Sequence, residues 1–210
     1  MRPRLPFDIL YEDERIIVID KPAGLLTTHT KVTGRAARES QATAENILND
    51  YVRKGQAKSK KRVWLVHRLD RETSGVMMFA KDEATADWYR DNWSELTEKT
   101  YIAKVEGKLE AEEGRFESFL KDDPKTMKVR SVGPDEGGKL AITEWRRVGD
   151  RVEVKLKTGR KNQIRVHFAE AGHPVKGDVK YGARKADRLY LHAKELKVKM
   201  RSGEWKTFSS

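Results

Sequence analysis

The sequence predicts an α+β fold with a mixed, largely antiparallel central sheet that is flanked by helices and loops. Short apolar runs typical of strands recur along the 210 residues and outnumber the helical segments in the second half. These elements do not follow the regular strand–helix alternation of a parallel sheet. No glycine-rich phosphate-binding loop follows any predicted strand. We expect residues 1–210 to form a single domain.

The first third of the chain predicts a buried strand, a helix and two polar loops. Residues 15–20 form a continuous, mostly β-branched run, and the turn signal Lys21 to Gly24 follows it. Residues 27–42 are polar and predict a loop that a ligand could order. Thr43 is placed to cap a helix that extends to about residue 54. Residues 54–62 are rich in lysine and predict an exposed basic loop.

The rest of the chain predicts a strand, two helices and a β-rich second half. Residues 76–80 are apolar and predict a strand, after which Asp82 can cap a helix over about residues 83–96. A second helix is expected over about residues 162–171, before Gly172. Residues 122–138 show no strong pattern. The strands expected in the second half cover residues 101–105, 115–120, 140–148, 152–157, 189–196 and 204–208.

The composition favours a polyanionic partner. Lys and Arg number 44 against 33 Asp and Glu, so the formal net charge is +11, which suits nucleic acid because neutralised phosphates release counterions. An anionic membrane surface fits less well, because the predicted helices do not combine a basic face with a broad apolar face. The chain has no cysteine, which excludes disulfides, thiolate catalysis and Cys-based metal sites. No apolar stretch follows the basic start, so we expect no signal peptide and a cytoplasmic protein.

One segment combines a carboxylate with flanking arginines before an apolar strand. Asp70 lies between Arg68 and Arg71 in the segment from Val66 to Met77. Nearby positive charge favours the ionised carboxylate that a nucleophile or a base requires. The alternative is a surface loop with ordinary ion pairs, and the charge pattern alone favours that interpretation.

Two further segments have features of a binding site. Lys157 to His167 is a basic turn that leads into a helix, where Arg165 could hold a carboxylate through a two-pronged pair. A solvated, cationic helix start explains this pattern at least as well. Tyr101, which follows Lys99 and Thr100, could stack on a nucleobase. A tyrosine in a strand is more often part of the core.

In order and character these segments resemble the RluA-type RNA pseudouridine synthases, and the resemblance spans nearly the whole chain. The His67-Arg68-Leu69-Asp70 segment is highly specific for this family when the other segments follow it. The other matching segments are Ile9–Asp13, Ile17–Gly24, Thr73–Gly75, Lys99–Tyr101, Thr158–Arg160, Gln163–His167, Gly177–Asp178 and Tyr181–Gly182.

The resemblance assigns roles to individual residues. Asp70 matches the catalytic aspartate, and Arg68 matches the arginine that enters the RNA where the target base has left. Tyr101 matches the tyrosine that stacks on the flipped uracil. Arg165 matches the basic residue that pairs with the aspartate. The remaining substrate-binding candidates are Ile164, as a wall of the uracil pocket, and His67, beside the loop; the candidates for RNA backbone contacts are Arg71, Lys99, Arg160 and Lys161.

The resemblance also implies an activity and its partners. It implies the pseudouridine synthase fold over residues 1–210, without a separate N-terminal RNA-binding domain, and the isomerisation of specific uridines in structured ribosomal or transfer RNA. The expected enzyme needs no metal, no cofactor and no cosubstrate, and we expect a monomer. The alternative is an inactive RNA-binding or ribosomal RNA assembly module. Retention of Asp70, Tyr101 and Arg165 together argues against it. A phosphate-handling nucleotide enzyme is excluded for want of a phosphate loop.

Overall fold

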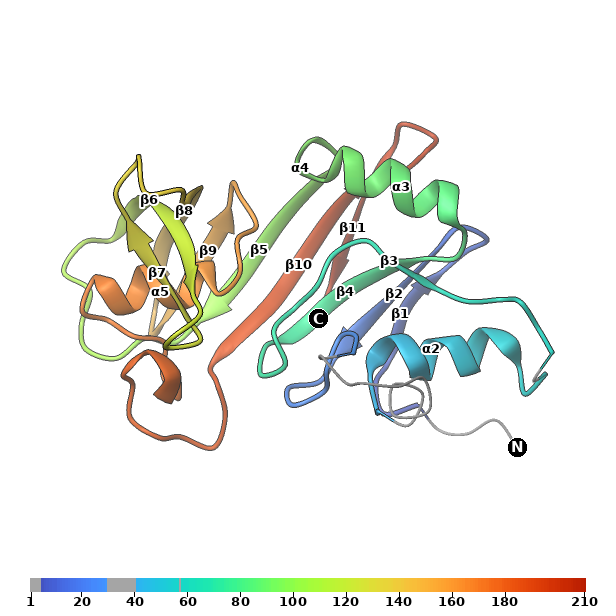
Figure 1. The fold of residues 1–210 in the computed structure, drawn as a ribbon, viewed down its shortest axis with the longest axis horizontal. Helices are drawn as coiled ribbons and strands as arrows, with labels where there is room; N and C mark the ends of the chain where they lie inside the picture. Colours follow the sequence, from blue (N-terminus) through green and yellow to red (C-terminus); the bar gives the residue numbers. More distant parts are fainter. Residues whose placement is uncertain (1–4, 30–40, 57) are drawn as a thin grey trace. The chain divides into compact units, whose positions relative to one another are not determined.

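The computed structural model describes residues 5–29, 41–56 and 58–210, which fall into two compact units (Figure 1). Unit 1 comprises the chain up to Thr97 together with Glu195–Ser210, and unit 2 comprises Glu98–Lys194. Strands predominate over helices in the described residues, and every pair of strands whose register is resolved is antiparallel. The predicted α+β architecture is therefore confirmed, whereas the single domain stays a prediction.

Unit 1 is a sheet with the strand order β1-β2-β4-β10, in which β3 pairs with β4 and β11 pairs with β10. The pairing of β2 with β4 brings Lys21, at the end of β2, opposite Gly75 at the start of β4. This register places the end of one strand beside the turn that contains Asp70. The elements of unit 1 are β1 (Ile9–Glu12), β2 (Ile16–Lys21), α2 (Ala44–Arg53), β3 (Trp64–Leu65), β4 (Ser74–Ala80), α3 (Glu83–Asp91), α4 (Trp93–Leu96), β11 (Trp205–Ser209) and part of β10 (Leu191–Lys199).

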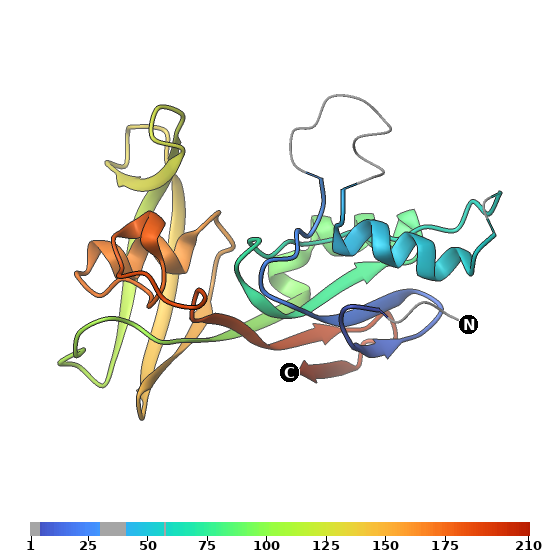
Figure 2. The same ribbon diagram turned by 90° about the horizontal axis from the view of Figure 1, so that it is seen from below.

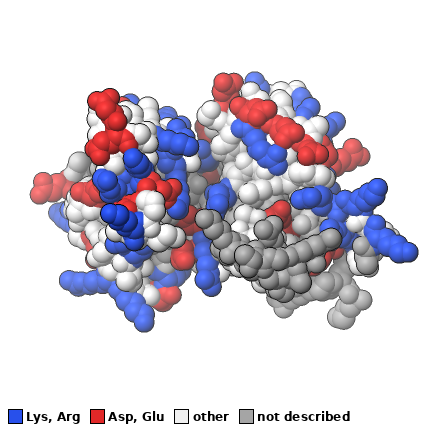
Figure 3. All heavy atoms as spheres, viewed as in Figure 1, with Lys and Arg blue, Asp and Glu red and all other residues white. Residues whose placement is uncertain are grey.

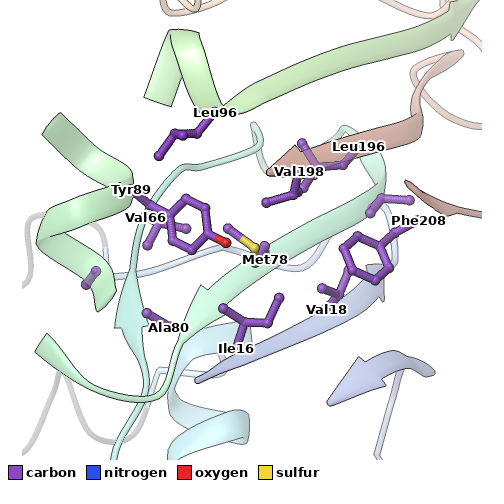
Figure 4. Packing of buried hydrophobic residues seen from close by; sticks show 12 residues of the cluster. Ile16, Val18, Val66, Met78, Ala80, Tyr89, Leu96, Leu196, Val198 and Phe208 are labelled. Atoms are coloured by element: carbon purple, nitrogen blue, oxygen red, sulfur yellow. The ribbon is translucent and has the colours of Figure 1, made fainter. Parts of the chain in front are cut away.

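The central strands of unit 1 are buried on both faces. All residues from Ile16 to Ile19 and from Val76 to Ala80 are at most 1% exposed, as is typical of strands covered on both sides. Alternate residues of these strands form one cluster with α3 and with the C-terminal strands, and Figure 4 shows Met78 near its centre, with Tyr89 beside it. The sheet is therefore a rigid support for the loops at its ends.

The predicted helix starts of unit 1 are confirmed, but one helix that was predicted as continuous is interrupted. The Oγ1 of Thr43 accepts a hydrogen bond from the Asn46 N–H, and the Oδ1 of Asp82 accepts one from the Thr85 N–H, as N-caps do. The helix predicted over residues 83–96 is interrupted, because Asn92 leaves the helical conformation and separates α3 from α4. The Asn92 side chain donates to the Trp88 carbonyl, and such local bonds compete with a continuous helix.

Unit 2 is an antiparallel sheet with the strand order β5-β9-β8-β6-β7, and α5 lies across one face of it (Figures 1 and 2). The strand β7, at the edge of this sheet, lies within residues 122–138 and was not predicted. Val166 of α5 packs with Leu120 and Val129 of the sheet. The elements of unit 2 are β5 (Thr97–Ala103), β6 (Glu113–Asp123), β7 (Lys128–Val132), β8 (Lys139–Val148), β9 (Arg151–Leu156), α5 (Gln163–Glu170), the 3-10 helix η1 (Val179–Tyr181) and the beginning of β10.

The loop predicted over residues 27–42 lies mostly outside the described residues. The basic loop predicted over residues 54–62 contains no helix or strand in its described part and is largely exposed, as expected.

The ammonium group of Lys21 is fully buried at the end of β2. Its Nζ donates to the carbonyls of Pro22 at 2.9 Å, Leu25 at 2.8 Å and Arg71 at 3.2 Å. Burial lowers the pKa of Lys21 to about 8, against the attraction of Glu72, Asp70 and Asp20. A buried cation therefore ties the end of β2 to the turn that follows Asp70.

Replacement of Met78 by Ala is expected to lower the free energy of unfolding by about 2–5 kcal/mol, because it leaves a cavity among side chains that cannot fully collapse. Met127 is 72% exposed, so Met127→Ala is the matched control and should change stability by no more than about 0.5 kcal/mol. Urea unfolding of the two variants and the wild type measures both effects. Equal losses in the two variants would contradict the assigned core.

The pH dependence of stability is expected to report the burial of Lys21. Between pH of about 8 and 10.5 the folded state releases the Lys21 proton while the unfolded state, with its ordinary pKa of 10.5, keeps it. The unfolded state then binds more protons, so stability rises with pH in this window. Across this window the free energy of unfolding of the wild type should rise by at most about 3 kcal/mol relative to that of Lys21→Met, which lacks the group. Urea unfolding of both proteins across the window measures the difference, and a difference that falls with pH would contradict the assignment.

Candidate active site

The turn around Asp70 is held by backbone hydrogen bonds on both sides of that residue. The Thr73 N–H donates to the Asp70 carbonyl at 3.1 Å, which closes the turn. Thr27 clamps the preceding residue, because its Oγ1 donates to the Leu69 carbonyl at 2.9 Å and accepts from the Leu69 N–H at 3.3 Å. The Asp70 carboxylate, which is only partly buried, therefore stands on a fixed segment of backbone.

The segment after β2 braces the other side of this turn. The Gly24 N–H donates to the Arg71 carbonyl at 2.8 Å, and the Arg71 Nε donates back to the Gly24 carbonyl at 3.0 Å. Gly24 has a φ of 87°, a conformation that suits glycine. Together with Lys21 these bonds connect two segments that are almost fifty residues apart in the sequence. Sequence reasoning treated Lys21 only as a turn signal and missed this role.

His67 and Arg68 have different environments. The Nε2 of His67 accepts a hydrogen bond from the Met78 N–H at 2.9 Å, so this nitrogen carries no proton. The imidazole also stacks on Trp93, with ring centroids 4.5 Å apart. His67 therefore anchors the segment on β4, which agrees with its expected position beside the loop. Arg68 is exposed, and its role in RNA stays a prediction.

In unit 2, Gln163 connects the basic turn to both α5 and β8. Its Oε1 accepts from the Thr158 Oγ1 at 2.8 Å and from the Arg160 N–H at 2.9 Å. Its Nε2 donates to Ile142 and Thr143 of β8. All four bonds belong to a side chain that is 2% exposed, so α5 begins at a defined point above the sheet.

The next two residues of α5, Ile164 and Arg165, are also buried. The guanidinium of Arg165 donates through Nε and Nη2 to the two carboxylate oxygens of Asp178, each at 2.7 Å. The sequence pattern predicted a two-pronged pair for Arg165, and the resemblance suggested Asp70 as its partner. The contribution of Asp178, which lies in the same unit as Arg165, was missed.

A further polar network fixes the other end of α5. His167 bonds through Nδ1 to Thr143 at 2.8 Å and through Nε2 to Ser118 at 3.0 Å. Burial lowers the pKa of His167, although Glu170 opposes this shift. The neutral imidazole can satisfy both hydroxyls, because each hydroxyl can donate or accept. This network therefore links α5 to β6 and β8.

Tyr101 and Lys99 lie on β5. Tyr101 is 9% exposed and is opposite Val154 of β9. Burial lowers the pKa of Lys99, and its Nζ lies close to Gly159 of the basic turn. The burial of Tyr101 agrees with a strand tyrosine that belongs to the core, whereas the enclosure of Lys99 was not predicted.

Besides Arg71, two more of the predicted RNA backbone contacts, Arg160 and Lys161, have intramolecular partners. The Arg160 Nε donates to the Leu140 carbonyl at 2.8 Å, and Lys161 forms an ion pair with Asp122. Both side chains are exposed, and exposed ion pairs are weak, so a phosphate could replace the Asp122 carboxylate. Their role in RNA binding stays a prediction.

The candidate residues thus divide between the two units. Unit 1 carries His67, Arg68, Asp70 and Arg71, braced by Lys21, and unit 2 carries Lys99, Tyr101, Arg160, Lys161, Ile164 and Arg165. An ionised carboxylate on a fixed turn can act as a nucleophile or as a base. A buried guanidinium in a fixed plane can hold an oxyanion or a carboxylate.

Neither a metal cluster nor a membrane-spanning helix is found in the part of the chain that the structure describes. No three His, Asp or Glu side chains come together there in a way that could hold a metal ion. The helices of the described residues are too short or too polar to cross a bilayer. On the face shown in Figure 3, Lys and Arg are interspersed with Asp and Glu on both units.

Comparison with known proteins shows the family. The family model described as RNA pseudouridylate synthase matches residues 15–170. The chain is 34% identical to the ribosomal large subunit pseudouridine synthase D of Borreliella burgdorferi, over 100% of this chain and 67% of that protein. It is 36% identical to the dual-specificity RNA pseudouridine synthase RluA of Yersinia pestis, over 90% of each protein.

The solved structures support the fold. Human RNA Pseudouridylate Synthase Domain Containing 1 matches with a TM-score of 0.75 and 22% identity, over 100% of this chain and 86% of that chain. The predicted pseudouridine synthase fold is therefore confirmed. The family match includes the Asp70 turn, Tyr101 and all of α5. The chain belongs to the RNA pseudouridylate synthase family, as its resemblance to the RluA-type enzymes predicted.

Proposed function

We propose that this protein converts specific uridines of structured RNA, either ribosomal or transfer RNA, into pseudouridine, with Asp70 as its catalytic residue. The observation that carries the proposal is the family match over residues 15–170, which contains the braced Asp70 turn and the buried Arg165. The names of the relatives from B. burgdorferi and Y. pestis, a ribosomal large subunit enzyme and a dual-specificity RNA enzyme, support RNA as the substrate.

The proposed reaction is an isomerisation. The C1′–N1 bond of uridine breaks, the uracil turns, and a C1′–C5 bond forms. The hydrogen on C5 leaves as a proton, and N1 gains a proton. No atom is lost overall, so the reaction requires no cosubstrate and no redox cofactor.

The target base has to leave its stack before the reaction, which costs roughly a few kcal/mol. In this proposal Arg68 fills the gap in the RNA, and its exposed side chain is consistent with that role. Tyr101 stacks on the detached uracil, with Ile164 as a wall of the pocket. These contacts keep the uracil in place until it rejoins the sugar through C5.

Asp70 starts the reaction by one of two routes, attack on the sugar or removal of the C2′ proton. Both routes require an ionised carboxylate. The buried ammonium of Lys21 lies in the same unit, and Asp70 attracts it. In the proposal Arg165 pairs with Asp70 and keeps it charged and directed at the sugar.

An RNA-binding module without catalysis is the second candidate. It would share the family fold and the excess of Lys and Arg, but it has no need of Asp70, Tyr101 and Arg165 together. We further propose that the protein acts in the cytoplasm as a monomer without a metal or cofactor. Sedimentation equilibrium of the purified chain, with and without RNA, tests the oligomeric state, and a stable dimer would contradict it.

Asp70→Asn should lower the single-turnover rate by at least about 10³-fold, because the amide can neither attack the sugar nor accept its proton. The release of tritium from RNA that is labelled at C5 of uridine measures the rate, since the C5 hydrogen leaves in the reaction. The RNA dissociation constant should change by less than about threefold. Asp87→Asn, which removes an equivalent charge from an exposed pair on α3, serves as the control. Full turnover by a pure Asp70→Asn or Asp70→Ala preparation would refute the assignment.

Deletion of the gene should remove pseudouridine from at least one position in ribosomal or transfer RNA. Sequencing of total RNA after chemical labelling of pseudouridine identifies that position and thereby the substrate. Wild-type protein should restore the modification, whereas Asp70→Asn should not. If Asp70→Asn restored it, or if no position changed, the protein would be better described as the RNA-binding module.

A further inference from the structure

We propose that Asp178 is a positioning residue that orients Arg165 for its part in the reaction. This inference rests on the proposed function, because it assigns Asp178 a role only through Arg165. Asp178 is the only buried Asp or Glu among residues 5–29, 41–56 and 58–210. It lies in unit 2 together with Arg165, so the geometry of the pair is defined within one unit.

The pair fixes the plane of the guanidinium. The Arg165 Nε donates to the Asp178 Oδ2, and Nη2 donates to Oδ1, each at 2.7 Å. Two parallel bonds to one carboxylate determine an orientation, which a single bond does not. They engage two of the five guanidinium N–H groups. The direction in which Nη1 donates is therefore set by Asp178.

Tyr181 restrains the same guanidinium through its ring. The Arg165 Cζ lies 5.2 Å from the centroid of the Tyr181 ring, within the range of a cation–π contact. The ring is itself held, because the Tyr181 hydroxyl accepts from the Val129 N–H at 3.0 Å and donates to Asn162 Oδ1 at 3.1 Å. Asn162 immediately precedes α5, so the Tyr181 ring is held in place by the start of the helix that carries Arg165.

The backbone of residues 177–183 is built to present Asp178. The Asp178 N–H donates to the Val175 carbonyl at 2.9 Å, and the Asp178 carbonyl accepts from Tyr181 and Ala183, each at 3.0 Å. Gly177 has a φ of 82°, and a Cβ on it would lie 2.0 Å from the Arg188 carbonyl oxygen. Only glycine fits there. The Gly-Asp pair of the sequence is thus explained by a close backbone approach and by the carboxylate that follows it.

A purely structural ion pair is the competing explanation. The Arg165 and Asp178 side chains are 7% and 0% exposed. A buried pair of this kind is a poor source of stability compared with apolar side chains of similar size. What the pair does provide is a fixed orientation of the guanidinium, because each charge holds the other in one geometry. That argument favours positioning, and a double-mutant cycle separates the two explanations.

The experiment compares Asp178→Asn, Arg165→Met and the double variant in single-turnover assays with C5-tritiated RNA. Asp178→Asn should slow the reaction about 100-fold, because a small misplacement of a directing group has an effect of this size. The RNA dissociation constant should change by less than about threefold. In the Arg165→Met background, Asp178→Asn should slow the reaction by less than about threefold, because Asp178 then has nothing to orient. The double variant should also unfold at a higher temperature than either single variant, because it contains no unpaired buried charge.

Val152→Ala, a cavity variant of a residue on β9 that is 2% exposed, serves as the control for lost stability. It should react at the wild-type rate at a temperature where all the variants are folded. An Asp178→Asn rate within threefold of wild type, beside a slow Arg165→Met, would overturn the inference and leave the proposed function intact. Multiplicative rate losses in the double variant would overturn it in favour of a structural role.

The failure of the proposed function gives a different pattern. Turnover at the wild-type rate by Asp70→Asn would refute the Asp70-dependent reaction in which Arg165 is assigned a part. A wild-type rate for Arg165→Met alone would remove the role of Arg165, and with it that of Asp178, while the assignment of Asp70 would stand.

Discussion

The segment around Asp70 depends on one buried ammonium group. Lys21 is fully buried and reaches the carbonyls of Pro22, Leu25 and Arg71. Burial of a cation without partners is costly, so the backbone has to keep these carbonyls directed at Nζ. The pairing of β2 with β4 then determines where the turn lies relative to the sheet. Electrostatics and strand register therefore fix the same segment, and displacement of the turn would break both.

The two units solve the problem of a buried cation in different ways. Lys21 is a compact charge whose three donors suit carbonyls that come from irregular backbone. Arg165 is a planar fork that matches the two oxygens of Asp178. The first arrangement tethers a turn, and the second sets a direction. Each is suited to the role proposed for it, since Asp70 needs a fixed backbone position and Arg165 needs a fixed orientation of its guanidinium.

Local chemistry made much of the fold predictable from the sequence. The caps formed by Thr43 and Asp82 were predicted because a cap involves residues only three positions apart. The break at Asn92 was missed because an asparagine inside a helical pattern is usually tolerated, and its bond to Trp88 becomes evident only in the structure. The strand β7 was missed because it is a short edge strand with mostly polar residues. Pairing with β6 stabilises it, and its own sequence carries little signal of that pairing.

The site itself was predictable only in part. The resemblance supplied Asp70, Tyr101 and Arg165, whereas the charge pattern alone favoured a surface loop with ordinary ion pairs. In the structure the Arg71 guanidinium donates to the Gly24 carbonyl, and the buried cation that Asp70 attracts comes from β2, about fifty residues earlier. In the described residues Lys21 and Arg165 are the only buried Lys or Arg, although the chain has 44 of these residues. Burial, which depends on distant contacts, therefore singles out these two cations from the many that lie at the surface.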